Sequence, residues 1–442
     1  MVDLIPTFGS ALYTIGAFIV ALSVIVAVHE YGHYIVGRWC GIKAEVFSIG
    51  FGPVLWSRPD RHGTQWQIAA LPFGGYVKFL GDASAVSDRA SDDYQELDED
   101  AKRHTMHGAP LWAGGLTVAE GPGFSFILSV IIFTGFALWI GVASQPVTVA
   151  SMKPVPDVFE ALQPGDAILE VEGREIVTAS DLTAIARDLP PQANVTYLVE
   201  RNGARAEVQA LFPYLPMIGA VTPNSAADSV GLMPGDVILS IDGEPIRTFF
   251  QLQERAVASE GRTLLLEVWR DGEMLEFSFN TKLGAVQTPE GMEERWLIGM
   301  TGDIGFELES RTPGVFEAIG YGAQRTYGVI AGSLTGLYSM ISGAIGTCNL
   351  SGPVGIAKTS GSTASQGLDS FIWFIAVLST AVGLLNLFPI PVLDGGHLVF
   401  HAYEALRGRP PSEKALRVFM AAGLALLLTL MVFALSNDLF CP

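Results

Sequence analysis

The stretch VALSVIVAVHEYGHYIVGRW, from Val20 to Trp39, governs how the rest of the chain is interpreted. It is an apolar run that contains the pattern H-E-x-x-H at His29, Glu30 and His33. Residues four apart share a helix face, so both imidazoles can reach one ion, with Glu30 beside them as a base. Two histidines that only pack are the alternative. Ionisable groups in a segment long enough to enter a bilayer are costly and usually functional, which favours a zinc hydrolase site.

Composition narrows the class of protein. The chain has 442 residues, of which 49% are hydrophobic, and a mean hydropathy of +0.38. These values are too apolar for an ordinary soluble protein, and the length allows several domains. The net charge of −19 argues against nucleic acid as a partner, because a polyanion would be repelled.

Four apolar segments predict membrane-spanning helices, at 11–37, 116–142, 370–389 and 415–435. Lysine and arginine crowd the loops after the first and third of them and are absent from both tails. The positive-inside rule therefore places both termini outside. A fifth apolar stretch, 327–346, is ambiguous. If it spanned, the end of the third span would emerge about 30 Å from H-E-x-x-H, so we predict a surface helix instead.

The predicted organisation is that of a polytopic α-helical membrane protein with four transmembrane helices, a membrane-associated β-loop and two tandem α+β modules. Short β-prone runs broken by Gly and Pro predict the hairpin of the β-loop. The expected order is a first span (1–37), a cytoplasmic loop with the hairpin (38–110), a second span (116–142), two exported modules (143–212 and 213–284), an exported linker with surface helices (285–369), a third span (370–393), a cytoplasmic loop (394–414) and a fourth span (415–435).

The two modules follow from an internal repeat. Residues 164–173 read PGDAILEVEG, and residues 234–243 read PGDVILSIDG. Each copy precedes a helical stretch and two β-prone runs joined at Asn202-Gly203 or Asp271-Gly272, a strong hairpin signal. The repeated string resembles the PDZ domain, which implies peptide binding at a sheet edge. Residues 217–221 are the expected peptide-binding strand of the second module; a rigid spacer is the alternative.

A catalytic zinc site needs a third protein ligand and an open position. The string NLFPIPVLDGGH, which begins at Asn386, provides Asp394 at the end of an apolar span, where an unpaired carboxylate is costly. Pro389 and Pro391 interrupt the helix before it. We predict Asp394 as the third ligand, with a role in capping the following turn as the alternative. The rival ligands in this region are His397 and His401.

Together these motifs resemble the site-2 protease family of intramembrane zinc metalloproteases, and among them the bacterial regulator-of-sigma-E type. The pairing of H-E-x-x-H in an early span with N-x-x-P-x-P-x-L-D-G-G in a late one is highly specific, and the likeness covers nearly the whole chain. It implies Zn²⁺ as cofactor. Two departures lie in the second span: Ser125 stands where the family has Asn, and Glu120 adds a carboxylate at the expected start of the helix.

The resemblance also implies the biological setting. The substrates would be single-span membrane proteins, chiefly anti-sigma factors shortened on the exported side, and leftover signal peptides. The site would be a bacterial inner membrane, with both termini and the PDZ modules in the periplasm, in contact with lipid and with peptide or exported domains. A non-enzymatic PDZ scaffold and a proton-coupled transporter are the alternatives. The expected substrate-binding residues are Gly74, Gly75 and Tyr76 in the β-loop and Asn386, Pro389 and Pro391.

Overall fold

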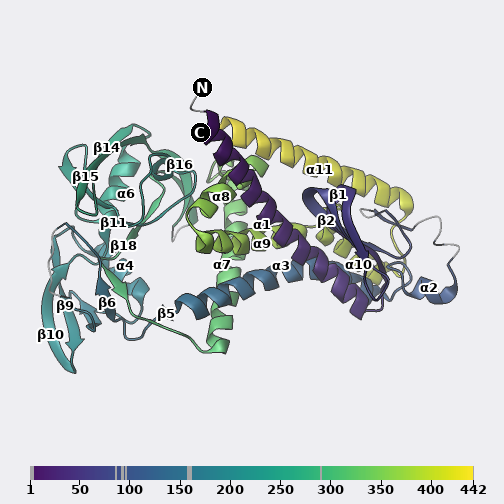
Figure 1. Cartoon of the computed structure of the whole chain (residues 1–442), viewed down its shortest axis with the longest axis horizontal. Coiled ribbons are helices and arrows are strands. Elements are labelled where there is room, and N and C mark those ends of the chain that lie inside the picture. Colours follow the sequence, from purple (N-terminus) through teal and green to yellow (C-terminus); the bar gives the residue numbers. More distant parts are fainter. Residues whose placement is uncertain are drawn as a thin grey trace. The chain divides into compact units, whose positions relative to one another are not determined.

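The computed structural model describes residues 4–84, 87–90, 94, 97–156, 162–288 and 291–441. The chain divides into two compact units, and each is described by itself. The first comprises residues 1–135, 319–334 and 350–441, and the second comprises residues 136–318, 335–349 and 442. Figure 1 shows long helices in the first unit and small twisted sheets in the second.

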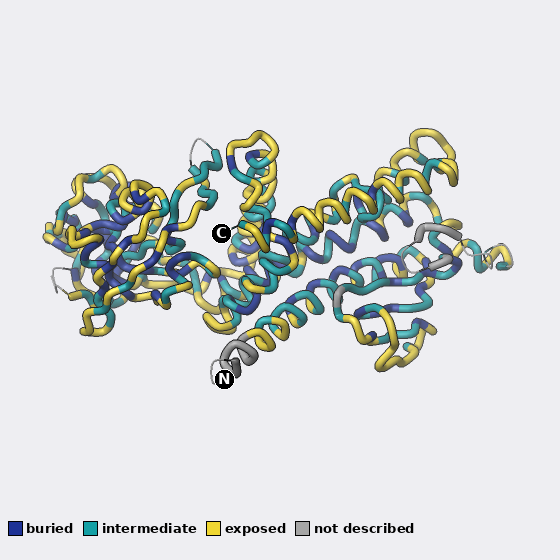
Figure 2. The backbone as a smooth tube through the Cα atoms, turned by 90° about the horizontal axis from the view of Figure 1, so that it is seen from above, coloured by how far each residue is buried: buried dark blue, intermediate teal, exposed yellow. Residues whose placement is uncertain are grey.

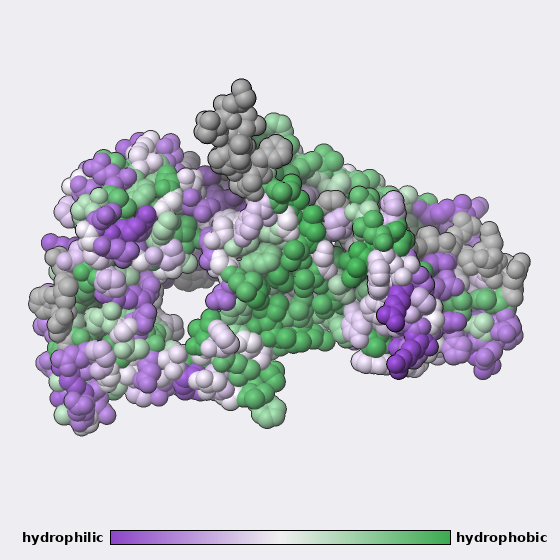
Figure 3. Space-filling model, viewed as in Figure 1, coloured by the Kyte–Doolittle hydropathy of each residue, from purple (hydrophilic) through white to green (hydrophobic). Residues whose placement is uncertain are grey.

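Among the described residues, four helices are long and apolar enough to cross a membrane. In the 18-residue apolar stretch that identifies each of them, no more than 28% of the residues are buried by protein, and Figure 3 shows hydrophobic residues gathered over this helical part. Figure 2 likewise shows mostly exposed and intermediate residues along the long helices. Apolar surface on this scale is stable in lipid, so the four predicted spans are confirmed. They are α1 (Leu4–Trp39), α3 (Leu111–Ile140), α9 (Leu368–Asn386) and α11 (Glu413–Phe440).

Hydroxyl groups join α3 to α9. Ser129 Oγ of α3 donates a hydrogen bond to the Ala376 carbonyl of α9 over 2.8 Å. Ser379 Oγ of α9 donates in return to the Ser125 carbonyl, also over 2.8 Å. The hydrophobic effect does not drive helices together in lipid, so hydrogen bonds and close packing of this kind hold spans in place.

The loop after α1 contains the predicted hairpin. It consists of β1 (Ala44–Pro59) and β2 (Gln65–Phe79). Both strands bend, because Phe47 of β1 is paired with Val77 near the end of β2 and also with Trp66 near its start. The first half of β1 therefore lies between the two ends of β2. The part of β2 from Gly75 onward forms an edge of this small sheet, next to α1.

Asp60 anchors the turn of this hairpin to α1. Its carboxylate accepts hydrogen bonds from the backbone N–H groups of His62 and Thr64, from Tyr34 Oη of α1 at 2.8 Å, and from Trp66 Nε1. Partial burial opposes ionisation, but these donors outweigh it and lower the pKa of Asp60 to about 2. The hairpin is thus tied to the helix that carries H-E-x-x-H.

Two more helices of the chain differ in how well they were predicted. Most of the fifth apolar stretch, 327–346, lies in α7 (Val315–Ile341), which is not among the four candidate spans; that it forms a surface helix stays a prediction. Residues 394–414 were expected to be a loop, but they contain α10 (Asp394–Arg407). The prolines end α9, and the sequence after them forms a new helix because it has good helix formers and a Gly408 C-cap with positive φ.

Helix α8 (Pro353–Ser365) begins at a side-chain cap from the far end of the chain. The Asp438 carboxylate of α11 accepts hydrogen bonds from the backbone N–H groups of Gly352, Val354 and Gly355. An anion that satisfies the free donors of a helix N-terminus is stabilising.

The shorter elements of the chain are β3 (Asp82–Ser84), β4 (Ser87–Ala90), α2 (Glu99–Arg103), β5 (Val142–Ala143), α5 (Ala226–Ser229), β16 (Lys282–Thr288), β17 (Gly291–Leu297), β20 (Ser310–Arg311) and the 3₁₀ turn Thr347–Asn349.

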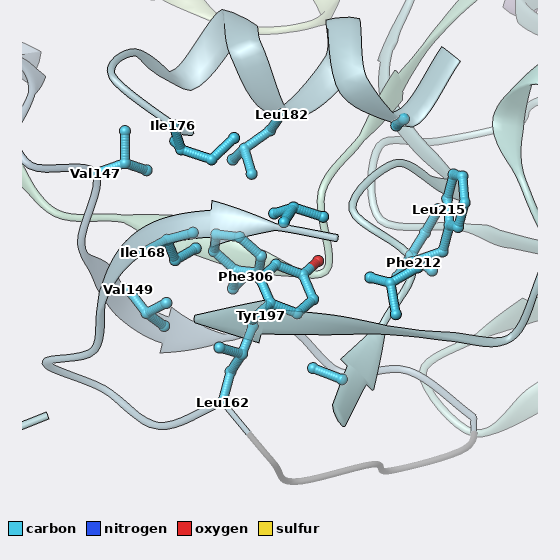
Figure 4. Close-up of a cluster of buried hydrophobic side chains, with 14 of the residues drawn as sticks. Val147, Val149, Leu162, Ile168, Ile176, Leu182, Tyr197, Phe212, Leu215 and Phe306 are labelled. Atoms are coloured by element: carbon cyan, nitrogen blue, oxygen red, sulfur yellow. The ribbon is translucent and has the colours of Figure 1, made fainter. Parts of the chain in front are cut away.

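The second unit holds the two predicted α+β modules. Both hairpin turns have positive φ at each central residue, at Asn202-Gly203 and Asp271-Gly272, as a tight hairpin requires. Figure 4 shows the core of the first module, where Ile168 and Leu182 pack around Tyr197. The first module contains β6 (Val149–Met152), β7 (Ala167–Val171), β8 (Arg174–Glu175), α4 (Ala179–Asp188), β9 (Asn194–Arg201) and β10 (Ala204–Leu211); the second contains β11 (Leu215–Val221), β12 (Val237–Ile241), β13 (Glu244–Pro245), α6 (Phe249–Ala258), β14 (Thr263–Arg270) and β15 (Glu273–Asn280).

One later segment completes both modules. Residues 285–369, expected to be linker and surface helices, also supply β18 (Met300–Asp303), which pairs with β11, and β19 (Phe306–Leu308), which pairs with β6. Strand β11 therefore lies between β12 and β18 and has no free edge. The prediction that residues 217–221 form the peptide-binding edge is wrong. The sequence did not reveal this because strand pairing joins residues far apart in the chain.

A buried ion pair explains why the string P-G-D recurs. Asp166 is fully buried and makes a bidentate contact with Arg201 at 2.7 Å, and Asp236 makes the same contact with Arg270 at 2.6 Å. Each aspartate also accepts a bond from a backbone N–H three residues before it. Each motif thus ties the loop before one central strand to the end of another.

We expect Asp236→Ala to destabilise the second module by about 3–5 kcal/mol, because it leaves the Arg270 guanidinium partly buried without its partner. Hydrogen exchange of the whole protein would report the change as lost protection in β12 and β14. The matched control is Arg295→Ala, which removes an ion pair with Glu293 whose side chains are both more than 40% exposed, and we expect at most about 0.5 kcal/mol there. Equal effects of the two changes would contradict this role for Asp236.

Candidate metal centre

Helix α1 brings the H-E-x-x-H residues to one place. His29 and His33 lie one turn apart, with ring centroids separated by 5.0 Å and ring planes at 82°. His29 is buried, with 8% of its surface exposed, and His33 and Glu30 are half-buried. The apolar helix around them keeps water away, so these polar groups need partners from elsewhere in the fold.

The partner comes from the start of α10. Asp394 Oδ2 lies 3.1 Å from His29 Nε2, and Asp394 Oδ1 lies 3.5 Å from His33 Nε2. The break at Pro389 and Pro391 allows this approach, since α9 ends at Asn386 and α10 starts anew at Asp394. Within the described part of the chain, these three residues form the one group of potential metal ligands. Each offers one ligand atom, and the three atoms lie within 4.8 Å of one another. The rivals His397 and His401 are not part of it.

The donor set fits a zinc ion. His33 Nδ1 lies 2.8 Å from the Thr117 carbonyl, which can only accept, so Nδ1 carries the hydrogen and a neutral ring presents a lone pair at Nε2. That lone pair faces a carboxylate, and two such groups repel each other unless a proton or a metal cation lies between them. Ligand atoms of a tetrahedral zinc site lie about 3.3 Å apart, close to the distances at Asp394. Two imidazoles and one carboxylate also leave a fourth position open.

Helix α3 forms the back wall of this group. Thr117, Gly121 and Ser125 are spaced four apart and lie on one helix face. The Thr117 carbonyl and Ser125 Oγ contact the Nδ1 atoms of His33 and His29, at 2.8 and 3.1 Å. Gly121 lies between them, and a Cβ placed there would be 2.2 Å from His33 Nε2. We did not identify Thr117 and Gly121 from the sequence; their spacing of four in an apolar helix was the available signal.

The two departures in this helix have different outcomes. Ser125 contacts His29, so it belongs to the metal centre. Glu120 was expected at the start of the span, but α3 begins at Leu111 and Glu120 lies inside it, half-buried. Its carboxylate lies beside Gly123, where a Cβ would be 2.9 Å from Glu120 Oε2, and no described contact joins it to the imidazoles.

The hairpin approaches the same group from another side. A Cβ at Gly75 of β2 would be 3.1 Å from Glu30 Cγ and 2.7 Å from the Ser48 carbonyl. Only glycine allows β2 to lie this close to α1. Tyr76, the next residue, has its ring stacked on Phe51 at 5.9 Å. The predicted substrate-binding strand is therefore placed beside Glu30.

The other predicted substrate-binding residues lie around the break between α9 and α10. Asn386 Nδ2 donates to the Val382 carbonyl of its own helix at 3.1 Å. Pro391 lies against Gly423 of α11, where a Cβ would be 3.0 Å from Pro391 Cδ. Pro389 is exposed. Pro391 thus has a packing partner in the fold, and Pro389 is accessible.

Comparison with known proteins identifies the family. Residues 17–430 match the sequence profile of Peptidase family M50. The chain belongs to this family. A Rhizobium meliloti (strain 1021) protein named as a zinc metalloprotease is 35% identical to this M50 peptidase, over 97% of the chain and 96% of the relative. The regulator of sigma E protease of Haemophilus influenzae is 32% identical over 97% and 99%, and that of Salmonella typhimurium (strain LT2) is 32% identical over 97% and 99%.

Membership of the family settles the class of enzyme. This M50 peptidase is a zinc metalloprotease of the site-2 protease type and a multi-pass membrane protein, with Zn²⁺ as its cofactor. The predictions of protease activity and of zinc are confirmed, and the scaffold and transporter alternatives lose their support. The chain spans nearly the whole length of its relatives.

Proposed function

We propose that this M50 peptidase cuts single-span membrane proteins inside the bilayer, with zinc held by His29, His33 and Asp394 and with Glu30 as general base. The observation that carries the proposal is the convergence of α1 and α10, which brings three suitable donor atoms within 4.8 Å. These residues come from opposite ends of the chain, so sequence proximity cannot account for it. Bound zinc would polarise a water molecule and the scissile carbonyl.

The residues of the chain supply the remaining chemistry. Glu30 is adjacent to His29 in α1 but outside the three-donor group, so its carboxylate is free to accept a proton from water and return it to the leaving amine. Burial of the site between the spans excludes bulk water and strengthens these electrostatic interactions. Glu30 can act as the base only if it does not bind the zinc ion, and its place outside the group of three ligand atoms supports this.

The edge of β2 is the proposed receptor for substrate. A transmembrane helix keeps its amides in internal hydrogen bonds, so it must unwind before its backbone can reach the zinc. An unwound segment that adds to the free edge of β2 from Gly75 onward would gain backbone hydrogen bonds. It would also lie next to Glu30, since Gly75 contacts the Glu30 side chain. Asn386 and Pro389 would contact the segment from the other side.

The names of two relatives support a biological role. Both of them carry the name regulator of sigma E protease. We therefore infer that the substrates include anti-sigma factors already shortened on the exported side, and leftover signal peptides. The role is regulated proteolysis in the envelope stress response. The protein would lie in a bacterial inner membrane with both termini and the PDZ-like modules in the periplasm, as the distribution of Lys and Arg supports.

The PDZ-like modules would act as a filter for the exported part of the substrate. In each module the outer strand, β18 or β19, is the edge at which an extended peptide could add. The segment that carries both strands is continuous, and Lys153 of the first module pairs with Asp303 of β18 at 2.6 Å. A bulky exported domain could not fit such an edge, whereas a shortened one could.

The test uses two single-span reporters in proteoliposomes, identical except that one carries a folded domain on its exported side. We expect the purified enzyme to hold one zinc per chain and to cut only the shortened reporter, inside the span. A chelator should abolish the cut, and added zinc should restore it. Cleavage outside the span, or cleavage that survives removal of zinc, would refute the proposed function.

A further inference from the structure

We propose that Ser125 is a positioning residue of the metal centre, which holds His29 in the tautomer and orientation that direct Nε2 at the ion. The inference rests on the proposed ligand set of His29, His33 and Asp394. Ser125 is fully buried in α3.

The hydrogen bonds around Ser125 assign the direction of its contact with His29. Ser125 Oγ lies 3.3 Å from the Gly121 carbonyl, to which it can only donate. Its hydroxyl hydrogen is therefore engaged along α3, and its oxygen accepts from His29 Nδ1 at 3.1 Å. In the tautomer that we propose, Nδ1 then carries the hydrogen and the neutral ring leaves its lone pair on Nε2, 3.1 Å from Asp394 Oδ2.

The position of Ser125 is itself held by α9. The Ser125 carbonyl accepts a hydrogen bond from Ser379 Oγ of α9 at 2.8 Å. A serine side chain has one rotatable bond before its oxygen, and the hydrogen bond from Oγ to the Gly121 carbonyl holds that bond in one rotamer. The contact is therefore preorganised and needs no rearrangement when a metal binds.

The two histidines differ in what orients them. His33 Nδ1 donates to the backbone carbonyl of Thr117, which no side-chain substitution removes. Apart from its contact with Asp394, the His29 ring has the Ser125 hydroxyl as its described polar partner. The ion-facing geometry of His29 is thus the part of the site that a single change at Ser125 can loosen while all three ligands remain.

The experiment measures zinc affinity by competition with a chelator, together with the absorption spectrum of the cobalt-substituted protein. We expect Ser125→Ala to weaken zinc binding about 10- to 100-fold, as loss of an outer partner of a metal-binding histidine does, and to alter the cobalt spectrum. Ser125→Thr, which keeps the hydroxyl, should restore most of the affinity. Thermal unfolding confirms that each variant is folded.

Ser129→Ala is the matched control. Ser129 is as fully buried as Ser125 and lies one turn further along α3, but the described hydrogen bonds of its hydroxyl go to the carbonyls of Ser125 and Ala376, not to a ligand. We expect its zinc affinity and cobalt spectrum to match the unchanged protein. Equal weakening by Ser129→Ala would trace the effect to helix packing, and unchanged affinity in Ser125→Ala would also overturn the inference. His29→Ala tests the proposed zinc ligands separately from the role of Ser125. If this variant keeps full zinc affinity, His29 is not a ligand and the proposed function is wrong at that point.

Discussion

Replacing Glu30 by glutamine should abolish cleavage while the protein still binds one zinc ion. The amide keeps the shape of the carboxylate but cannot accept a proton from water at neutral pH. Loss of a general base costs about 10²- to 10⁴-fold in turnover. Zinc content should be unchanged, because Glu30 lies outside the group of three donor atoms. Turnover of the shortened reporter and metal analysis of the same preparation measure the two effects together.

Glu120→Gln provides the control for this result. Glu120 is also a half-buried carboxylate within a spanning helix, and it lies one residue from Gly121, which touches the imidazoles. No described contact joins its carboxylate to His29, His33 or Asp394, so we expect turnover close to that of the unchanged enzyme. If Glu30→Gln retained turnover within tenfold while Glu120→Gln lost it, the base would have to be reassigned to Glu120.

Gly121→Ala should abolish tight zinc binding although it adds only one methyl group. The new Cβ would lie 2.2 Å from His33 Nε2 and 2.8 Å from His29 Nε2, so both imidazoles would have to move from their positions facing Asp394. Alanine is a better helix former than glycine, so α3 itself should be intact. We expect zinc affinity to fall about 100-fold or more, the upper end for disrupted support of metal ligands. Chelator competition measures it.

The matched control is Gly135→Ala in the same helix. Gly135 is exposed, and nothing lies within 4 Å of the position its Cβ would take. We expect unchanged zinc affinity and a thermal stability equal to or slightly above that of the original protein, as the helix preference for alanine implies. Full zinc affinity in Gly121→Ala would mean that α3 does not form the back wall of the site.

The predictable parts of the fold were those with a local cause. Continuous apolar runs predicted the four spans, because burying so much apolar surface in lipid requires no partner within the protein. The two Asn-Gly and Asp-Gly turns predicted their hairpins, because the positive φ they need is a property of those residues. The proline break before Asp394 was predicted for the same reason, although the helix α10 that follows it was not.

The errors came from interactions between distant segments. Residues 217–221 were expected to form a free edge, but β18, about eighty residues further along, covers it. The Asp–Arg pairs behind P-G-D were invisible for a similar reason, since each joins residues 34 or 35 apart. A sequence pattern shows which residues can form strand pairs or ion pairs, but it does not show which distant segment provides the partner.

The amino-acid sequence by itself determined the chemistry of this protein: which side chains can bind zinc, which can act as a base, and which helices lie in lipid. These follow from residue types and short spacings, which act within one turn or one span. The tertiary structure alone decided the surroundings of that chemistry, from the Thr117, Gly121 and Ser125 wall to the approach of β2 to Glu30. Those contacts join helices and strands that are remote in the chain, and their distances are set by packing that no local pattern encodes.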